Sequence, residues 1–62
     1  MNNDFEVMHI RDVNKRHRDI ATFNNETEAR KYFSEKMYNM EAGEYLSLTD
    51  LKEGRQLLAY ES

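Results

Sequence analysis

Residues 25–43 constrain the fold of this chain more than any other segment, because the signals for helix start, helical period and helix stop agree there. Asn25 is a favoured N-cap residue, and Glu28 lies three positions later, where its side chain can reach back to the cap. Gly43 is expected to end the helix in a left-handed conformation. One apolar stripe follows helical spacing at Ala29, Phe33, Met37 and Met40, with Tyr32 and Lys36 beside it.

Two strands and a turn are predicted before this helix. Residues 4–13 are rich in strand-forming Val, Ile and Phe, with apolar side chains on both faces. Residues 14–18 contain no apolar residue and begin with a turn former, so they are predicted to form a hairpin tip. Residues 19–23 are then the return strand.

A second hairpin is predicted after the helix. Within residues 44–51, Leu46 and Leu48 alternate with polar or amphipathic neighbours, which indicates a half-buried strand. Residues 52–54 form a short connection whose Gly54 suits the left-handed position of such a turn. Residues 55–61 are predicted to be the last strand.

The sequence therefore predicts one small α+β domain over residues 1–62, with two hairpins flanking a central helix (ββαββ). A helix laid on an antiparallel sheet buries its stripe against one face of that sheet only. Apolar residues on the other face would form an exposed patch of the kind that marks an interface. The candidates for that patch are Phe5, Val7, Met8, Ile10, Leu51, Leu58 and Tyr60.

Size limits the stability of such a domain. A chain of 62 residues buries only about 60% of its unfolded surface, and small folds often gain stability from disulfides, a metal or oligomerisation. The chain has no cysteine and two histidines far apart in sequence, so disulfides and thiolate zinc sites are excluded and a metal is not expected. We therefore expect a homo-oligomer, in the simplest case a homodimer.

Charge and hydropathy give expectations for location and partners. The N-terminal residues are polar and do not resemble a signal peptide, and no apolar run approaches the roughly 20 residues that cross a bilayer. We expect a cytoplasmic protein with no membrane partner. The net charge is −3, and the whole excess of acidic residues lies in residues 32–62. This balance does not favour general attraction to nucleic acid.

Two groups of residues are candidates for partner binding. Lys15, Arg16 and Arg18 flank His17 at the predicted hairpin tip, where they could contact phosphates or an acidic protein surface, or simply form a solvated turn. Tyrosine is favoured at interfaces because it combines rigid area with a hydroxyl, although it can equally line a small core. Three of the four tyrosines are therefore added as candidate partner-binding residues: Tyr38, Tyr45 and Tyr60.

No constellation in the sequence predicts catalysis. His9 and His17 have no ligand spacing, no serine lies in a nucleophile frame, and the two glycines cannot form a phosphate-binding loop. Glu26 and Glu28 suit a helix N-terminus, and the other acidic pairs, Glu41 with Glu44 and Asp50 with Glu53, are expected on a solvated face. We expect a protein that is not an enzyme and has no cofactor.

Residues 21–33, Ala-Thr-Phe-Asn-Asn-Glu-Thr-Glu-Ala-Arg-Lys-Tyr-Phe, are similar to the strand-into-helix junction of the arm-type DNA-binding domains of tyrosine recombinases. The likeness covers about a fifth of the chain. The predicted hairpin after the helix and the acidic balance depart from that family, so no family is assigned.

The function expected from the sequence is that of a small protein-binding module that self-associates and acts through an exposed sheet face or edge. In composition it resembles the small accessory or modulator proteins of bacteria and phages. The alternative is a nucleic-acid-binding protein that uses the basic tip at Lys15, Arg16 and Arg18.

Overall fold

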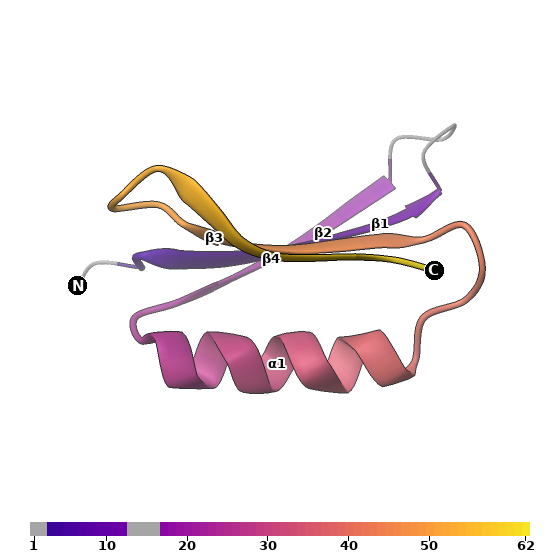
Figure 1. Ribbon diagram of the computed structural model, residues 1–62, viewed down its shortest axis with the longest axis horizontal. Helices are drawn as coiled ribbons and strands as arrows, with labels where there is room; N and C mark the ends of the chain where they lie inside the picture. The colour runs from indigo at the N-terminus through magenta and orange to yellow at the C-terminus, as the bar shows by residue number, and fades with distance from the viewer. Residues whose placement is uncertain (1–2, 13–16) are drawn as a thin grey trace.

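The computed structural model describes residues 3–12 and 17–62. The elements in chain order are β1 (Phe5–Asp12), β2 (His17–Phe23), α1 (Glu26–Tyr38), β3 (Tyr45–Asp50) and β4 (Arg55–Glu61). This order confirms the predicted ββαββ arrangement. The helix lies along one side of the sheet, as the view in Figure 1 shows.

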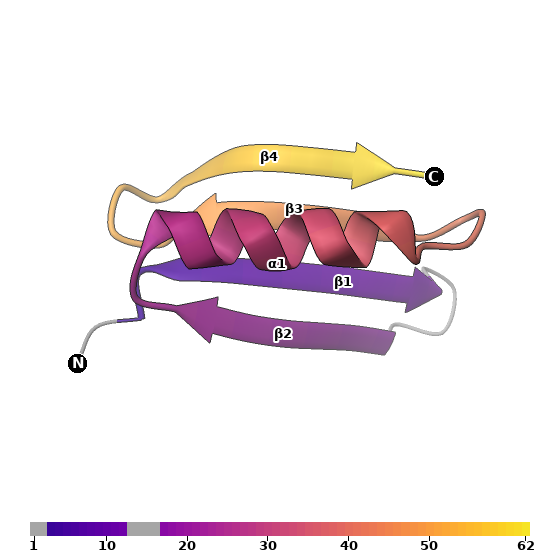
Figure 2. The same cartoon turned by 90° about the horizontal axis from the view of Figure 1, so that it is seen from below.

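The four strands form one antiparallel sheet in the order β2-β1-β3-β4. Each hairpin contributes one central and one edge strand. The two hairpins meet where β1 pairs with β3, from Phe5 opposite Asp50 to Ile10 opposite Tyr45. The helix runs above these two central strands, with β2 and β4 on either side (Figure 2).

The start of the helix follows the prediction and its end does not. The Asn25 side chain accepts a hydrogen bond of 2.8 Å from the backbone N–H of Glu28, which is the expected N-cap. The helix ends at Tyr38, because Asn39 caps it: its side-chain amide donates to the Glu35 carbonyl at 3.0 Å. The prediction that Gly43 ends the helix is therefore wrong. Gly43 (φ 89°) lies in the turn before β3, and its N–H donates to the Ser62 carbonyl at 2.9 Å.

The core lies between the helix and the two central strands. Its fully buried members are Val7, Ala29, Phe33, Leu46 and Leu48. The remaining residues of the predicted helical stripe, Met37 and Met40, are half-buried and pack against this core. The rings of Phe23 and Tyr32 meet at its margin, with centroids 5.2 Å apart. Burying this stripe is what holds a helix of this length in place, since short isolated helices are marginal in water.

A β-bulge interrupts the pairing of β3 with β4. Leu48 pairs with Leu58 and Thr49 with Gln56, so Leu57 has no residue opposite it. Both Leu57 and Leu58 pack against the core, and Gln56 shares the face of Thr49. The turn that precedes β4 contains Gly54 at φ 68°, as predicted. The Asp50 carboxylate accepts from the N–H groups of Lys52 and Glu53, at 3.0 and 3.1 Å.

The sheet leaves one face without a covering element. Side chains alternate along a strand, and directly paired residues share a face. Among the described residues, no helix or strand packs over the face opposite α1 (Figure 1). We call this surface the open face. It comprises Glu6, Met8 and Ile10 of β1, Arg18, Ile20 and Thr22 of β2, Tyr45, Ser47 and Thr49 of β3, and Gln56, Ala59 and Glu61 of β4.

Of the seven apolar residues considered for an exposed patch, only Met8 and Ile10 lie on the open face. Val7 is in the core and Phe5 packs against it. Leu58 and Tyr60 are on the helix side, because they pair with Leu48 and Leu46. Leu51 lies in the turn between β3 and β4.

Candidate protein-binding surface

The pairing register arranges the open face in three rows that run across the sheet. In the order β2-β1-β3-β4, the first row reads Arg18, Ile10, Tyr45, Glu61. The second reads Ile20, Met8, Ser47, Ala59, and the third reads Thr22, Glu6, Thr49, Gln56. The large apolar side chains therefore lie in the first two rows, on β2, β1 and β3, and the third row is polar throughout.

Four large side chains make up the apolar centre of the open face: Ile20, Met8, Ile10 and Tyr45. Ile20 is 57% exposed, although a β-branched residue of this size is usually buried. It pairs with the half-buried Met8, and Ile10 pairs with the half-buried Tyr45. These four adjacent positions form a contiguous apolar surface rather than scattered exposed residues.

The Tyr45 side chain is held in place on this surface. Its hydroxyl accepts a hydrogen bond of 2.9 Å from the Gln56 side-chain amide, two rows away. The bond bridges the row that contains Ser47 and Ala59, and Ser47 is only 3% exposed. The bulge makes this bond possible, because it brings Gln56 onto the same face as Tyr45. A fixed aromatic ring loses little conformational freedom when it is covered.

Opposite charges lie at the two ends of the first row. Arg18 is on edge strand β2 and Glu61 is on edge strand β4, and both side chains are exposed. The full width of the sheet separates them. The apolar centre is thus flanked by a cation at one edge and an anion at the other.

The structure separates the six residues predicted to bind a partner. Lys15 and Arg16 lie outside the described residues. Arg18 was expected in the hairpin tip but belongs to β2, as does His17, because β2 pairs with β1 as far as His17. Arg18 and Tyr45 are together on the open face, at either side of Ile10.

The other two tyrosines are on the far side of the molecule. Tyr38 is 84% exposed at the end of α1, and Tyr60 lies on the helix side of β4.

Sequence reasoning missed Ile20, which was noted only as part of a return strand. Ile20 pairs with Met8 and so completes the apolar centre of the open face. The sequence of either strand alone does not specify the register that creates this pairing.

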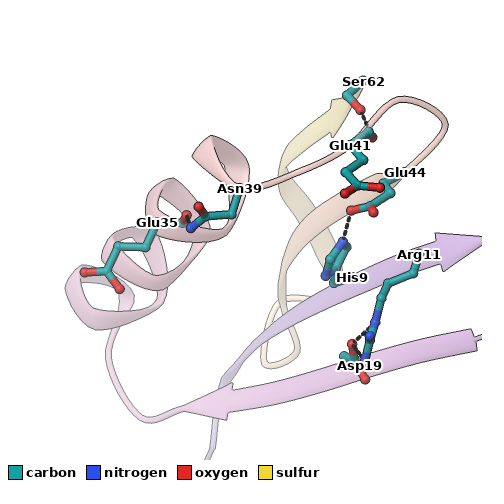
Figure 3. A network of polar contacts seen from close by, with 8 residues as sticks. All are labelled: His9, Arg11, Asp19, Glu35, Asn39, Glu41, Glu44 and Ser62. Carbon is teal, nitrogen blue, oxygen red and sulfur yellow. Dashed lines mark hydrogen bonds and ion pairs between the residues drawn. The ribbon is translucent and has the colours of Figure 1, made fainter.

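A polar cluster lies at one end of the helix side, shown in Figure 3. A hydrogen bond of 2.6 Å joins His9 Nε2 to the Glu44 carboxylate, and the two side chains are only 11% and 13% exposed. The expectation that Glu44 lies on a solvated face is therefore wrong. His9 lies two residues after buried Val7 on the same strand, so its side chain also points toward the helix side. The other ring nitrogen, Nδ1, is buried without a hydrogen-bond partner among the described residues.

Next to this pair, the Arg11 guanidinium donates to the Asp19 carboxylate at 2.7 Å across the first hairpin (Figure 3). That hydrogen bond is the main reason why the pKa of Asp19 is lowered from its usual value. Both side chains are largely exposed, and exposed pairs of this kind contribute little to stability.

Within residues 3–12 and 17–62, no three His, Asp or Glu side chains are grouped to hold a metal ion. A shallow surface depression of about 200 Å³ lies at the bulge and is lined by Gln56, Leu57, Leu58 and Ala59, none of which titrates. In the same part of the chain, no helix is long and apolar enough to cross a membrane.

Comparison of the chain with protein-family models, with curated proteins and with solved structures finds no match.

Proposed function

We propose that this protein is a non-catalytic binding module that binds another protein surface through the open face of its sheet. The observation that carries the proposal is the apolar centre formed by exposed Ile20 with half-buried Met8, Ile10 and Tyr45 on the side that α1 does not cover. An apolar surface of this kind on a small soluble fold is a feature of interaction sites.

The composition of the face supports a protein partner. Protein interfaces combine an apolar centre, in which aromatic residues and Met are enriched, with a polar rim. Here Tyr45 and Met8 lie in the centre, and Thr22, Glu6, Thr49 and Gln56 form one side of the rim. A surface for nucleic acid would need several cations. Among the described residues, Arg18 is the member of the predicted basic tip that lies on this face.

The location of the titratable groups supports a binding role rather than catalysis. The buried His9–Glu44 pair lies on the helix side of the sheet, away from the open face. The surface depression at the bulge offers neither a nucleophile nor a general base.

The proposal is tested by tagged capture from lysate of the organism that encodes the chain, run in parallel with and without nuclease treatment. Three baits are compared: the native chain, Ile20→Glu and Tyr38→Glu. Ile20→Glu places a carboxylate in the apolar centre, where a bound partner would have to desolvate it. Tyr38→Glu places the same charge on the exposed surface of the helix and serves as the matched control.

We expect proteins that are retained by the native and Tyr38→Glu baits and lost from the Ile20→Glu bait. Circular dichroism establishes that all three baits are folded. Equal retention on the Ile20→Glu bait would contradict the assignment of the open face. Loss of every retained protein on nuclease treatment would favour the nucleic-acid alternative instead.

A further inference from the structure

We propose that the open face is closed by the open face of a second copy of this chain, related by a two-fold axis that runs parallel to the strands. This inference rests on the proposed function, since it names one occupant of the same surface. The geometry that carries it is the order of side chains in the three rows.

A symmetric dimer requires a surface that is complementary to itself. When two open faces are brought together about an axis parallel to the strands, each row meets the same row of the second copy in reverse order. Strand β2 then lies over β4, and β1 lies over β3. Arg18 of each copy therefore faces Glu61 of the other, and two pairs of opposite charge close the first row.

The apolar pairs are also satisfied by this arrangement. Ile10 of each copy meets Tyr45 of the other, so the large apolar residues of the first row pack on one another. In the second row, Ile20 meets Ala59, and Met8 lies over Ser47, which is only 3% exposed, so that Met8 meets the neighbouring side chains that cover it. The large Ile20 side chain thus lies over the small Ala59, which fits the roughly 10 Å separation of packed sheets.

The other two-fold axis in the interface plane, perpendicular to the strands, gives a poorer match. It places the first row against the third, so that Ile10 faces Glu6 of the second copy. A carboxylate would be buried against an apolar side chain, which is unfavourable. Arg18 would face Thr22 and the charges at the sheet edges would remain unpaired across the interface.

The usual angle between packed sheets does not prevent the charge pairs. Aligned sheets pack at about 30°. An edge strand lies roughly 7 Å from the centre of a four-stranded sheet, so this angle displaces edge positions by about 4 Å. The long side chains of Arg18 and Glu61 can span such a displacement.

The size of the face sets the expected strength of the dimer. Four strands of about six residues give a planar footprint of roughly 400 Å² per copy, whereas a standard interface buries about 800 Å² per partner. We therefore expect a weak dimer that forms at micromolar to millimolar concentration. Another protein that binds the same face would have to displace the second copy.

The experiment is sedimentation equilibrium over that concentration range with the native chain, Arg18→Glu, Glu61→Arg and the double variant. We expect the native mass to rise toward twice 7.5 kDa with concentration. Each single variant places like charges opposite each other twice, and we expect it to weaken the dimer about tenfold or more. The double variant restores opposite charges and is expected to return to within about threefold of the native constant.

Lys31→Glu is the matched control, because it changes the net charge as Arg18→Glu does but lies on the exposed surface of the helix. It is expected to leave the dimer unchanged. Amide shifts that move with concentration at Ile20 and Ala59, and not in α1, would independently place the contact on the open face.

A native chain that stays monomeric up to millimolar concentration would overturn this inference. The proposed function would survive that result if Ile20→Glu still abolished retention of other proteins. A dimer with no response to the charge exchange would also overturn the inference. A dimer that Ile20→Glu leaves intact, together with unchanged capture, would overturn both.

Discussion

The His9–Glu44 pair shows how much one residue can depend on another in a core this small. Both side chains are mostly buried, and their 2.6 Å hydrogen bond joins β1 to the residue just before β3. A buried polar group that loses its partner keeps the cost of desolvation, whereas replacing both partners by apolar groups can be nearly neutral. The two residues should therefore respond to substitution as a unit.

We expect Glu44→Leu alone to destabilise the protein by about 1–3 kcal/mol, because it leaves the imidazole without its acceptor. The double variant His9→Leu, Glu44→Leu should cost clearly less than the sum of the two single variants. Urea unfolding of the native chain, both single variants and the double variant measures this coupling. Additive losses would show that the pair contributes no mutual stabilisation.

Single residues also mark where sequence reasoning stopped. His9 shares a face with Val7, but apolar residues occur on both faces of β1, so the sequence did not show which face is buried. The burial of Glu44 was not predictable either, since a carboxylate before a strand is usually solvated and its partner lies far away in the chain. Ile20 is a similar case, because its exposure depends on which face the helix covers.

At the scale of an element, α1 combines a buried aromatic residue with a highly exposed one. Phe33 is 5% exposed and Tyr38 is 84% exposed on the same helix. We expect Phe33→Ala to cost about 3–5 kcal/mol, which is comparable with the whole stability of a small domain. Tyr38→Ala should change the stability by about 0.5 kcal/mol or less, because it removes few contacts.

Thermal and urea unfolding of both variants compare these values directly. Equal losses in the two variants would mean that the helix packs with a different face on the sheet. The N-terminal half of this element was predictable from Asn25 and the apolar spacing. Its C-terminal end was not predictable. Asn39 and Gly43 can each end a helix, and the sequence does not show which of them does so.

The bulge in β4 is an element that the sequence alone could not place. Adjacent Leu57 and Leu58 fit either face of an ordinary strand, and only the register with β3 shows that both pack toward the core. A shift of one residue would have placed Gln56 on the helix side and removed its bond to Tyr45. The strand boundaries were predicted closely, but the face of each side chain required the register.

At the scale of the whole molecule, the ββαββ order was predictable and the strand order was not. Local patterns identify hairpins, because their strands are neighbours in the chain. The pairing of β1 with β3 joins strands that are far apart in the sequence, and no local pattern specifies it. The charges at opposite edges of the open face become part of one surface only through this central pairing.

The central β1–β3 pairing has a consequence for how fast the chain folds. More than half of the chain lies between the residues that pair there, whereas each hairpin closes a short loop. Hairpins form in about 1–10 μs, and contacts between distant parts of a chain must first overcome a larger loop-closure entropy. The step that limits folding should therefore be the meeting of two preformed hairpins.

Val7 lies in that pairing, opposite Leu48, and is buried. We expect Val7→Ala to slow folding, with at least about half of its destabilisation appearing in the folding rate measured by stopped-flow mixing. A variant that only unfolds faster would place the central pairing after the rate-limiting step. If the two hairpins form quickly and their docking is slow, the contact between β1 and β3 sets the folding rate of the whole chain.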